Sequence, residues 1–118
     1  MKKILFICTL PFISSIVFAQ CDTSNVYDSI TCYEKELKLN KSQLNKTYQK
    51  LYKTLDSDGQ KILENSQKSW LLYKNSHCDE LVSHLSMSSL GAGSKLINLS
   101  CNLELIQQRT KQLKALEE

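Results

Sequence analysis

The amino-acid sequence predicts an all-α fold: a small, disulfide-stapled domain of three helices in which the first two form an antiparallel helical hairpin. Three observations support this prediction. After residue 19, apolar residues recur every three or four positions in three separate runs, as on one face of a helix. No run in this part alternates apolar and polar residues as a strand would. Four cysteines remain there, an even number that suits disulfide pairing.

Residues 1–19 have the pattern of a secretory signal peptide. Two lysines precede an apolar run that ends in Val-Phe-Ala, with short side chains where signal peptidase reads them, so we expect cleavage after Ala19. The run is too short to span a membrane comfortably, and Gln20 before Cys21 does not suit lipoprotein processing. No retained membrane anchor is therefore expected. Residues 20–118 should form one helical domain that is periplasmic or secreted.

Without the expected signal peptide, the chain is nearly neutral. It keeps 13 basic and 12 acidic residues, a formal charge of +1, which favours neither nucleic acid nor an anionic membrane as a partner. Loss of Cys8 leaves four cysteines, and in a small exported domain these predict two disulfides. The four are Cys21, Cys32, Cys78 and Cys101.

The first helix is expected from about Asn25 to Leu55. No glycine or proline interrupts this stretch, and its apolar residues share one helical face. They are Ile30, Tyr33, Leu37, Leu44, Tyr48, Leu51 and Leu55. The sequence DSDG at 56–59 is typical of a turn, and its aspartates can cap the next helix.

The second helix should run to about Ser88 and the third from there to the C-terminus. SLGAGS at 89–94 separates them, because Gly91 or Gly93 can take the left-handed conformation that ends a helix, and Ser94 can cap the third helix. The expected inward face of the second helix is Leu63, Ser66, Trp70, Tyr73, His77, Leu81 and Leu85. That of the third is Leu96, Leu99, Leu103, Ile106 and Leu113.

An aromatic stripe at helical spacing usually belongs to a core. We therefore expect Trp70 and Tyr73 to pack in the interior together with Leu44 and Tyr48 of the first helix. Cys78 lies one position off this stripe, where it can reach a neighbouring helix.

Catalytic and metal-binding patterns are not found. His77 and Cys78 are adjacent on a helix and point about 100° apart, so they cannot form a thiolate–imidazole pair. Together with His84 they match no zinc spacing. The sequence contains no Ser-His-Asp set, glycosidase carboxylate pair or phosphate loop. We expect neither an enzyme nor a bound metal or cofactor.

The order of several features resembles a known family. Two cysteines precede Leu44-Asn45-x-x-Tyr48, and Gln67-x-x-Trp70-x-x-Tyr73-Lys74 leads into Cys78, a Gly-x-Gly-Ser loop, Cys101 and Arg109. In this order the chain, from Cys21 to Leu116, resembles the LprI-like family of exported bacterial proteins, whose namesake inhibits lysozyme. The resemblance implies an exported binding protein with a protein partner, lysozyme, whose inhibition protects the cell wall. The alternative is an envelope interaction module or toxin-immunity module without lysozyme activity.

If the chain inhibits lysozyme, the candidate contact is the loop at 90–95. A lysozyme cleft holds two carboxyl groups. Gly91 and Gly93 allow close backbone approach, Ser94 can donate a hydrogen bond, and Lys95 brings a cation. A plain connection between two helices explains the same residues.

Four cysteines permit three disulfide pairings. Folding the chain at the first turn places Cys32 and Cys78 at the same end of the hairpin. Folding it at the glycine turn brings Cys101 within reach of Cys78, with an offset of about 7 Å along the axis. We expect Cys21–Cys32 and Cys78–Cys101; the pattern Cys32–Cys78 with Cys21–Cys101 is also geometrically open.

Overall fold

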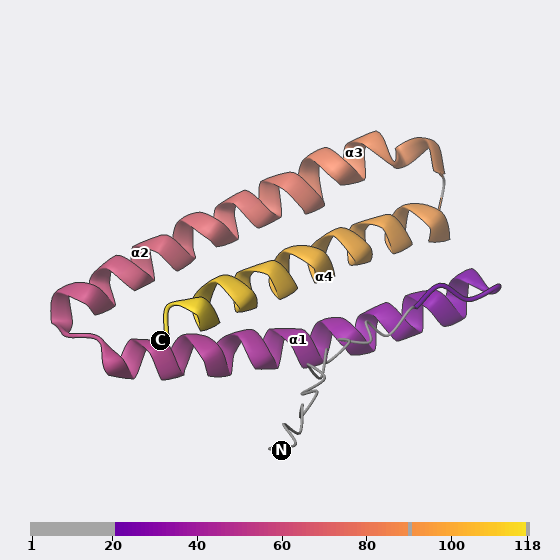
Figure 1. Ribbon diagram of the computed structural model, residues 1–118. Coiled ribbons are helices and arrows are strands. Elements are labelled where there is room, and N and C mark those ends of the chain that lie inside the picture. Colours follow the sequence, from indigo (N-terminus) through magenta and orange to yellow (C-terminus); the bar gives the residue numbers. More distant parts are fainter. Residues whose placement is uncertain (1–20, 90, 118) are drawn as a thin grey trace, which may run out of the picture.

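The computed structural model describes residues 21–89 and 91–117, so the expected signal peptide at 1–19 lies outside the described residues. The described chain forms three long helical segments and, within these ranges, no strand (Figure 1). Two disulfides join parts of it. The predicted fold class is confirmed. None of the helices in the described ranges is long and apolar enough to cross a membrane.

Helix α1, Val26–Thr54, follows the expected bounds closely. Asn25 caps its start, because the side-chain oxygen of Asn25 accepts a hydrogen bond from the backbone N–H of Tyr27 at 2.9 Å. Its buried apolar residues are seven positions apart, the repeat with which one helix presents a continuous face to another. They are Ile30, Leu37, Leu44 and Leu51.

A two-residue turn, Leu55–Asp56, reverses the chain. The Asp56 carboxylate accepts the backbone N–H of Gly59 at 2.8 Å and so caps the next helix. The Gln60 side chain donates to the carbonyls of Tyr52 and Leu55, which satisfies the end of α1. A Cβ at Gly59 would lie 3.1 Å from Asp56 Oδ1 and 3.2 Å from Leu55 Cβ, so glycine allows this close turn.

The second helical segment is not a uniform α-helix. Helix α2, Ser57–Lys74, continues into a π-helix, η1, Asn75–Val82, and then into the short α3, Ser83–Leu85. A 3₁₀ turn, η2, Met87–Ser89, ends the segment close to the predicted position. Figure 1 shows this segment running antiparallel to α1, as the predicted hairpin requires.

Helix α4, Ala92–Ala115, begins directly after Gly91, whose φ of 70° is readily adopted only by glycine. The prediction that Ser94 caps this helix is wrong, because the chain already turns at Gly91. Ser94 lies in the first turn of α4, where its hydroxyl hydrogen-bonds that of Ser86 at 3.1 Å.

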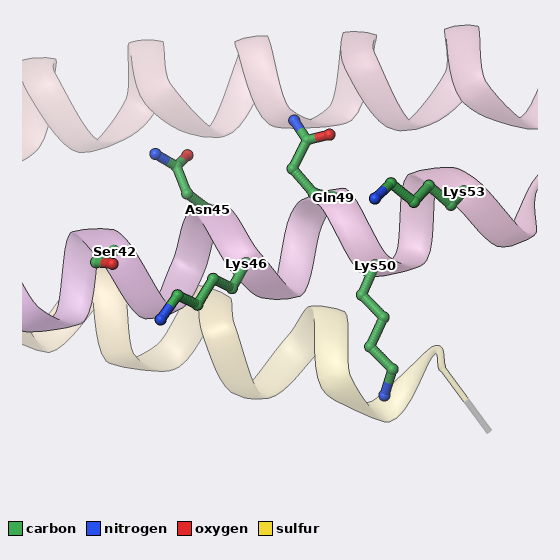
Figure 2. A pocket seen from close by; sticks show the side chains of 6 residues that line it. All are labelled: Ser42, Asn45, Lys46, Gln49, Lys50 and Lys53. Atoms are coloured by element: carbon green, nitrogen blue, oxygen red, sulfur yellow. The ribbon is translucent and has the colours of Figure 1, made fainter.

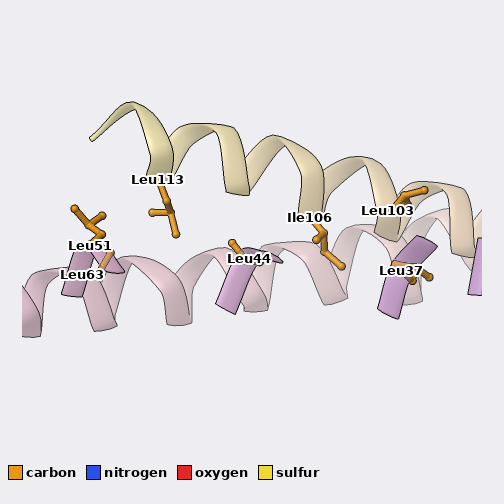
Figure 3. Close-up of a cluster of buried hydrophobic side chains, with 7 residues drawn as sticks. All are labelled: Leu37, Leu44, Leu51, Leu63, Leu103, Ile106 and Leu113. Carbon is orange, nitrogen blue, oxygen red and sulfur yellow. The ribbon is translucent and has the colours of Figure 1, made fainter. Parts of the chain in front are cut away.

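The main packing partner of α1 is α4, which runs parallel to it over most of its length. Lys95 binds Glu34 near one end of this pair, and Lys50 binds Glu117 at the other. Figure 3 shows side chains of the two helices meeting between them. The buried apolar cluster is Leu37, Leu44, Leu51, Leu63, Leu103, Ile106 and Leu113. The hairpin therefore depends on a third helix to form its core.

Candidate functional site

The π-helix η1 changes which side chains face α4. Hydrogen bonds from i to i+5 widen the helical turn, so inward positions recur every four residues. Cys78 of η1 points inward with 0% of its surface exposed, as does Lys74, the last residue of α2, with 8%, whereas Tyr73 is 54% exposed. The prediction that Tyr73 belongs to the core is therefore wrong: at the end of α2 the inward position is taken by the next residue, Lys74, and the ring of Tyr73 lies outside.

Tyr73, near the end of α2, begins a row of outward-facing side chains that continues along η1 and α3. Its ring stacks on His77, with centroids 5.5 Å apart and planes inclined by 17°. Leu81 and Leu85 follow at the same four-residue spacing and are 51% and 69% exposed. This row faces away from the apolar cluster.

Arg109 of α4 joins α2 to α4. Its guanidinium lies over the Trp70 ring, 5.9 Å from the ring centroid, an arrangement that attracts a cation to the aromatic face. Its Nε donates to Gln67 Oε1 and one of its terminal nitrogens to Ser66 Oγ, both at 2.9 Å. Three further residues were expected in the core. Leu44 is buried within the apolar cluster, and Trp70 and Tyr48 are partly buried against it.

A polar network joins the end of α2 and η1 to α4. The Lys74 ammonium donates to Asn102 Oδ1 at 2.7 Å, and the Asn102 amide donates to Asp79 Oδ1 at 3.0 Å. Asn98 donates to the same carboxylate oxygen at 3.0 Å. Its amide also lies 3.1 Å from the backbone oxygen of Cys78, next to the disulfide. Polar side chains thus bind η1 to α4 where an apolar contact was expected.

Burial and neighbouring charges shift two pKa values in this network. Burial lowers the pKa of Lys74 below its ordinary value; Asp79 opposes this change and Lys41 adds to it. Burial alone would raise the pKa of Asp79, but hydrogen bonds from Asn102 and Asn98 and the Lys74 charge hold it below its ordinary value.

A groove of about 430 Å³ lies between α1 and the end of α2, and α4 contributes Ile106 to its lining. Its apolar and aromatic residues are Leu44, Tyr48, Trp70, Leu71 and Ile106. Its polar residues are Lys41, Asn45, Gln49, Gln67, Lys74 and Asn75. The sequence motifs Leu44-Asn45-x-x-Tyr48 and Gln67-x-x-Trp70-x-x-x-Lys74 therefore meet at one groove, which makes it the candidate functional site.

Both expected disulfides are present, and the pairing inferred from the two chain reversals is confirmed. Cys21 is bonded to Cys32, with Cα atoms 5.5 Å apart, and Cys78 to Cys101, with Cα atoms 5.7 Å apart. The second bond joins η1 to α4 beside the polar network. The bond ties η1 to the half of α4 nearer the glycine turn, at the tenth residue of the helix.

The four residues predicted to contact a partner lie at this end, but mostly within α4. Only Gly91 precedes the helix; Gly93, Ser94 and Lys95 belong to its first turn. The side chain of Lys95 is 55% exposed and its ammonium lies 2.6 Å from Glu34. Their part in binding stays a prediction.

The outer face of α1 carries a shallow, basic depression (Figure 2). It is lined by Ser42, Asn45, Lys46, Gln49, Lys50 and Lys53. Lys50 is paired with Glu117, while Lys46 and Lys53 are exposed. In the described ranges, no group of three or more His, Cys, Asp or Glu residues could hold a metal ion.

Comparison with protein families relates this geometry to known proteins. The model of the family described as "Lysozyme inhibitor LprI" matches residues 19–113, most of the chain. The chain belongs to the LprI family. No significant match was found among curated proteins or among solved structures. The resemblance inferred from the order of motifs is thereby confirmed.

Sequence reasoning missed two features of this LprI chain. The polar network was missed because Lys74 and Asn102 are buried, whereas buried positions are recognised in a sequence by apolar residues. The groove was missed because the helical repeat indicates which face points inward, but not how closely α1 and α2 approach. One feature of the sequence did indicate a different inward face. Cys78 had to reach another helix to form a disulfide, although it lay one position off the predicted apolar stripe of the second helix.

Proposed function

We propose that the chain is an exported binding protein that inhibits lysozyme. The match to the lysozyme-inhibitor family over residues 19–113 is the observation that carries this proposal. The two disulfides support export, because such bonds persist mainly in oxidising compartments. An inhibitor acts by occupying the cleft of the enzyme, so it requires a rigid protruding element rather than a catalytic set.

The contact proposed for the lysozyme cleft is the end of the molecule that carries Gly91, Gly93, Ser94 and Lys95. A Cβ placed on Gly91 would meet no atom within 4 Å, so this side is open to a partner. The Lys95 ammonium already binds the half-exposed carboxylate of Glu34, and a carboxyl group of the enzyme would replace Glu34. The Cys78–Cys101 disulfide supports this role by tying the N-terminal half of α4 to η1.

A turbidity assay tests the inhibition. Bacterial cells are treated with c-type or g-type lysozyme, with and without the purified domain, and clearing of the suspension is monitored. We expect the domain to slow clearing by at least one of the two enzymes. Undiminished clearing with both enzymes would contradict inhibition and favour an envelope interaction or immunity module.

The variant Lys95→Gln tests the contact. We expect weaker inhibition at an unchanged melting temperature, because an exposed ion pair contributes only about 0–1 kcal/mol to folding. Lys53→Gln is the matched control, since it removes the same charge from the outer face of α1. Equal inhibition by both variants and the unmodified domain would move the contact to another surface.

Export is tested by mass spectrometry of the secreted or periplasmic product. We expect Gln20 to be its first residue. A product that retains residues 1–19, or that begins at a lipidated Cys21, would overturn this expectation.

A further inference from the structure

Lys74 is in an unusual position for a lysine at the groove. Only 8% of its surface is exposed, yet it contributes to the groove lining. An ammonium group carries three N–H donors, and among the described residues it finds one hydrogen-bond acceptor, Asn102 Oδ1. No carboxylate in the described ranges lies within ion-pair distance of it. A buried cation of this kind is costly unless an anion accompanies it.

Lys41 adds a second positive charge to the same groove. It lines the groove from α1, across from Lys74, and the two ammonium groups are close enough to affect each other electrostatically. Asp79 is the acidic residue that attracts Lys74, but its carboxylate accepts hydrogen bonds from Asn98 and Asn102. Among the described residues, no acidic side chain lines the groove itself. Its charge therefore complements an anion.

The other residues that line the groove suit a ligand that has an apolar body and an amide group. Tyr48, Trp70 and Leu71 offer aromatic and apolar surface, and Asn45 and Gln67 offer amide donors and acceptors. A volume of about 430 Å³ falls in the range of sites that enclose a small molecule, and apolar walls with a few polar groups are typical of such sites.

We propose that the groove between α1 and α2 binds a small organic acid. Its carboxylate lies between Lys74 and Lys41, and its apolar part, which carries an amide, lies against Trp70 and Tyr48. This ligand site is distinct from the Lys95 end of the molecule and does not depend on lysozyme inhibition. The recessed position of the Lys74 charge favours a small molecule over a protein surface, which could not reach into the groove.

Trp70 provides the measurement, because it is the single tryptophan of the chain and lines the groove. The probe is N-acetyl-L-phenylalanine, which has a carboxylate, an amide and an apolar ring. Its control is N-acetyl-L-phenylalaninamide, in which an uncharged amide replaces the carboxylate. We expect the acid to change Trp70 fluorescence saturably, and the amide to bind at least about tenfold more weakly, as expected from loss of one charge-assisted hydrogen bond.

Two lysine variants locate the site. Lys41→Met should weaken binding of the acid severalfold without changing the melting temperature, because Lys41 is exposed and lies on the groove. Lys46→Met removes the same charge from an exposed position of α1 outside the groove lining and should leave binding unchanged. Equal binding of acid and amide, equal effects of the two variants, or no saturable change would each overturn the proposal.

Discussion

Trp70 joins three features of the molecule in one side chain. It packs partly buried against the apolar cluster, its ring lies beneath the Arg109 guanidinium, and it lines the groove. Tyr73, one helical turn later in the same sequence motif, is 54% exposed and contacts His77 instead. Neighbouring aromatic residues of one motif thus have different energetic roles.

Alanine substitution should separate these two roles. We expect Trp70→Ala to lower the free energy of unfolding by about 3 kcal/mol, the lower end for truncation of a tryptophan, since the ring is only partly buried. Tyr73→Ala should lower it by less than about 0.5 kcal/mol, as is usual for an exposed position. Urea unfolding monitored by far-ultraviolet circular dichroism measures both. Similar losses would mean that Tyr73 is packed in solution.

At the scale of elements, η1 marks the limit of what could be predicted from the sequence. The bounds of α1 were predictable because Ile30 to Leu51 repeat regularly and Asn25 is a typical cap. The inward face of η1 was not, because the wider turn of a π-helix cannot be read from a pattern of apolar residues. The apolar Leu81 of η1 and Leu85 of α3 point outward, and the polar Lys74 at the end of α2 points inward, the reverse of the usual rule.

The candidate site was predictable only in part. The motifs quoted from the sequence contain part of the groove lining, but Leu44, Tyr48 and Trp70 were assigned to the core, and Lys41, Gln49, Leu71 and Asn75 were not singled out. A side chain on an inward face can be covered by a neighbouring helix or can line a gap between two helices, and the spacing of apolar residues is the same in both cases.

The polar network between η1 and α4 predicts a specific response to acid. The pKa of Asp79 is lowered in the folded protein, so its charge stabilises the fold above the ordinary carboxyl pKa near 4. This contribution to stability is lost as the pH falls through the lowered pKa of Asp79 in the folded protein. We expect Asp79→Asn to cost about 1 kcal/mol at neutral pH, the net value of a typical hydrogen bond, and less as the pH falls below about 4.

Chemical unfolding at a series of pH values measures this difference. The two proteins should converge in stability at low pH, where the native carboxyl group is protonated as well. A difference that stays constant from neutral to acid pH would show that the charge of Asp79 contributes nothing.

At the scale of the whole molecule, the parallel contact of α1 and α4 holds the fold together. Most of the apolar cluster comes from these two helices, and α2 adds Leu63. Ion pairs close both ends of the contact, and the Cys78–Cys101 bond joins η1 to α4. Stability should therefore depend on the inward face of α4.

Two isoleucines of α4 test this dependence with the same chemical change. Ile106 is 2% exposed within the apolar cluster, and Ile97 is 41% exposed. We expect Ile106→Ala to lower the free energy of unfolding by about 2–5 kcal/mol, and Ile97→Ala by about 1 kcal/mol or less. Thermal unfolding of both variants provides the comparison. An equal loss would place the core on another face of α4.

The contact between α1 and α4 also determines when the chain can fold. Lys50 and Glu117, which are bonded in the folded protein, are 67 residues apart in sequence. Contacts between such distant residues slow folding compared with an up-and-down bundle, in which neighbouring helices pair first. During synthesis the part of the apolar face of α1 that packs on α4 stays uncovered until α4 has left the ribosome. For a protein exported as proposed, this delay keeps the nascent chain open until nearly the whole domain has been made.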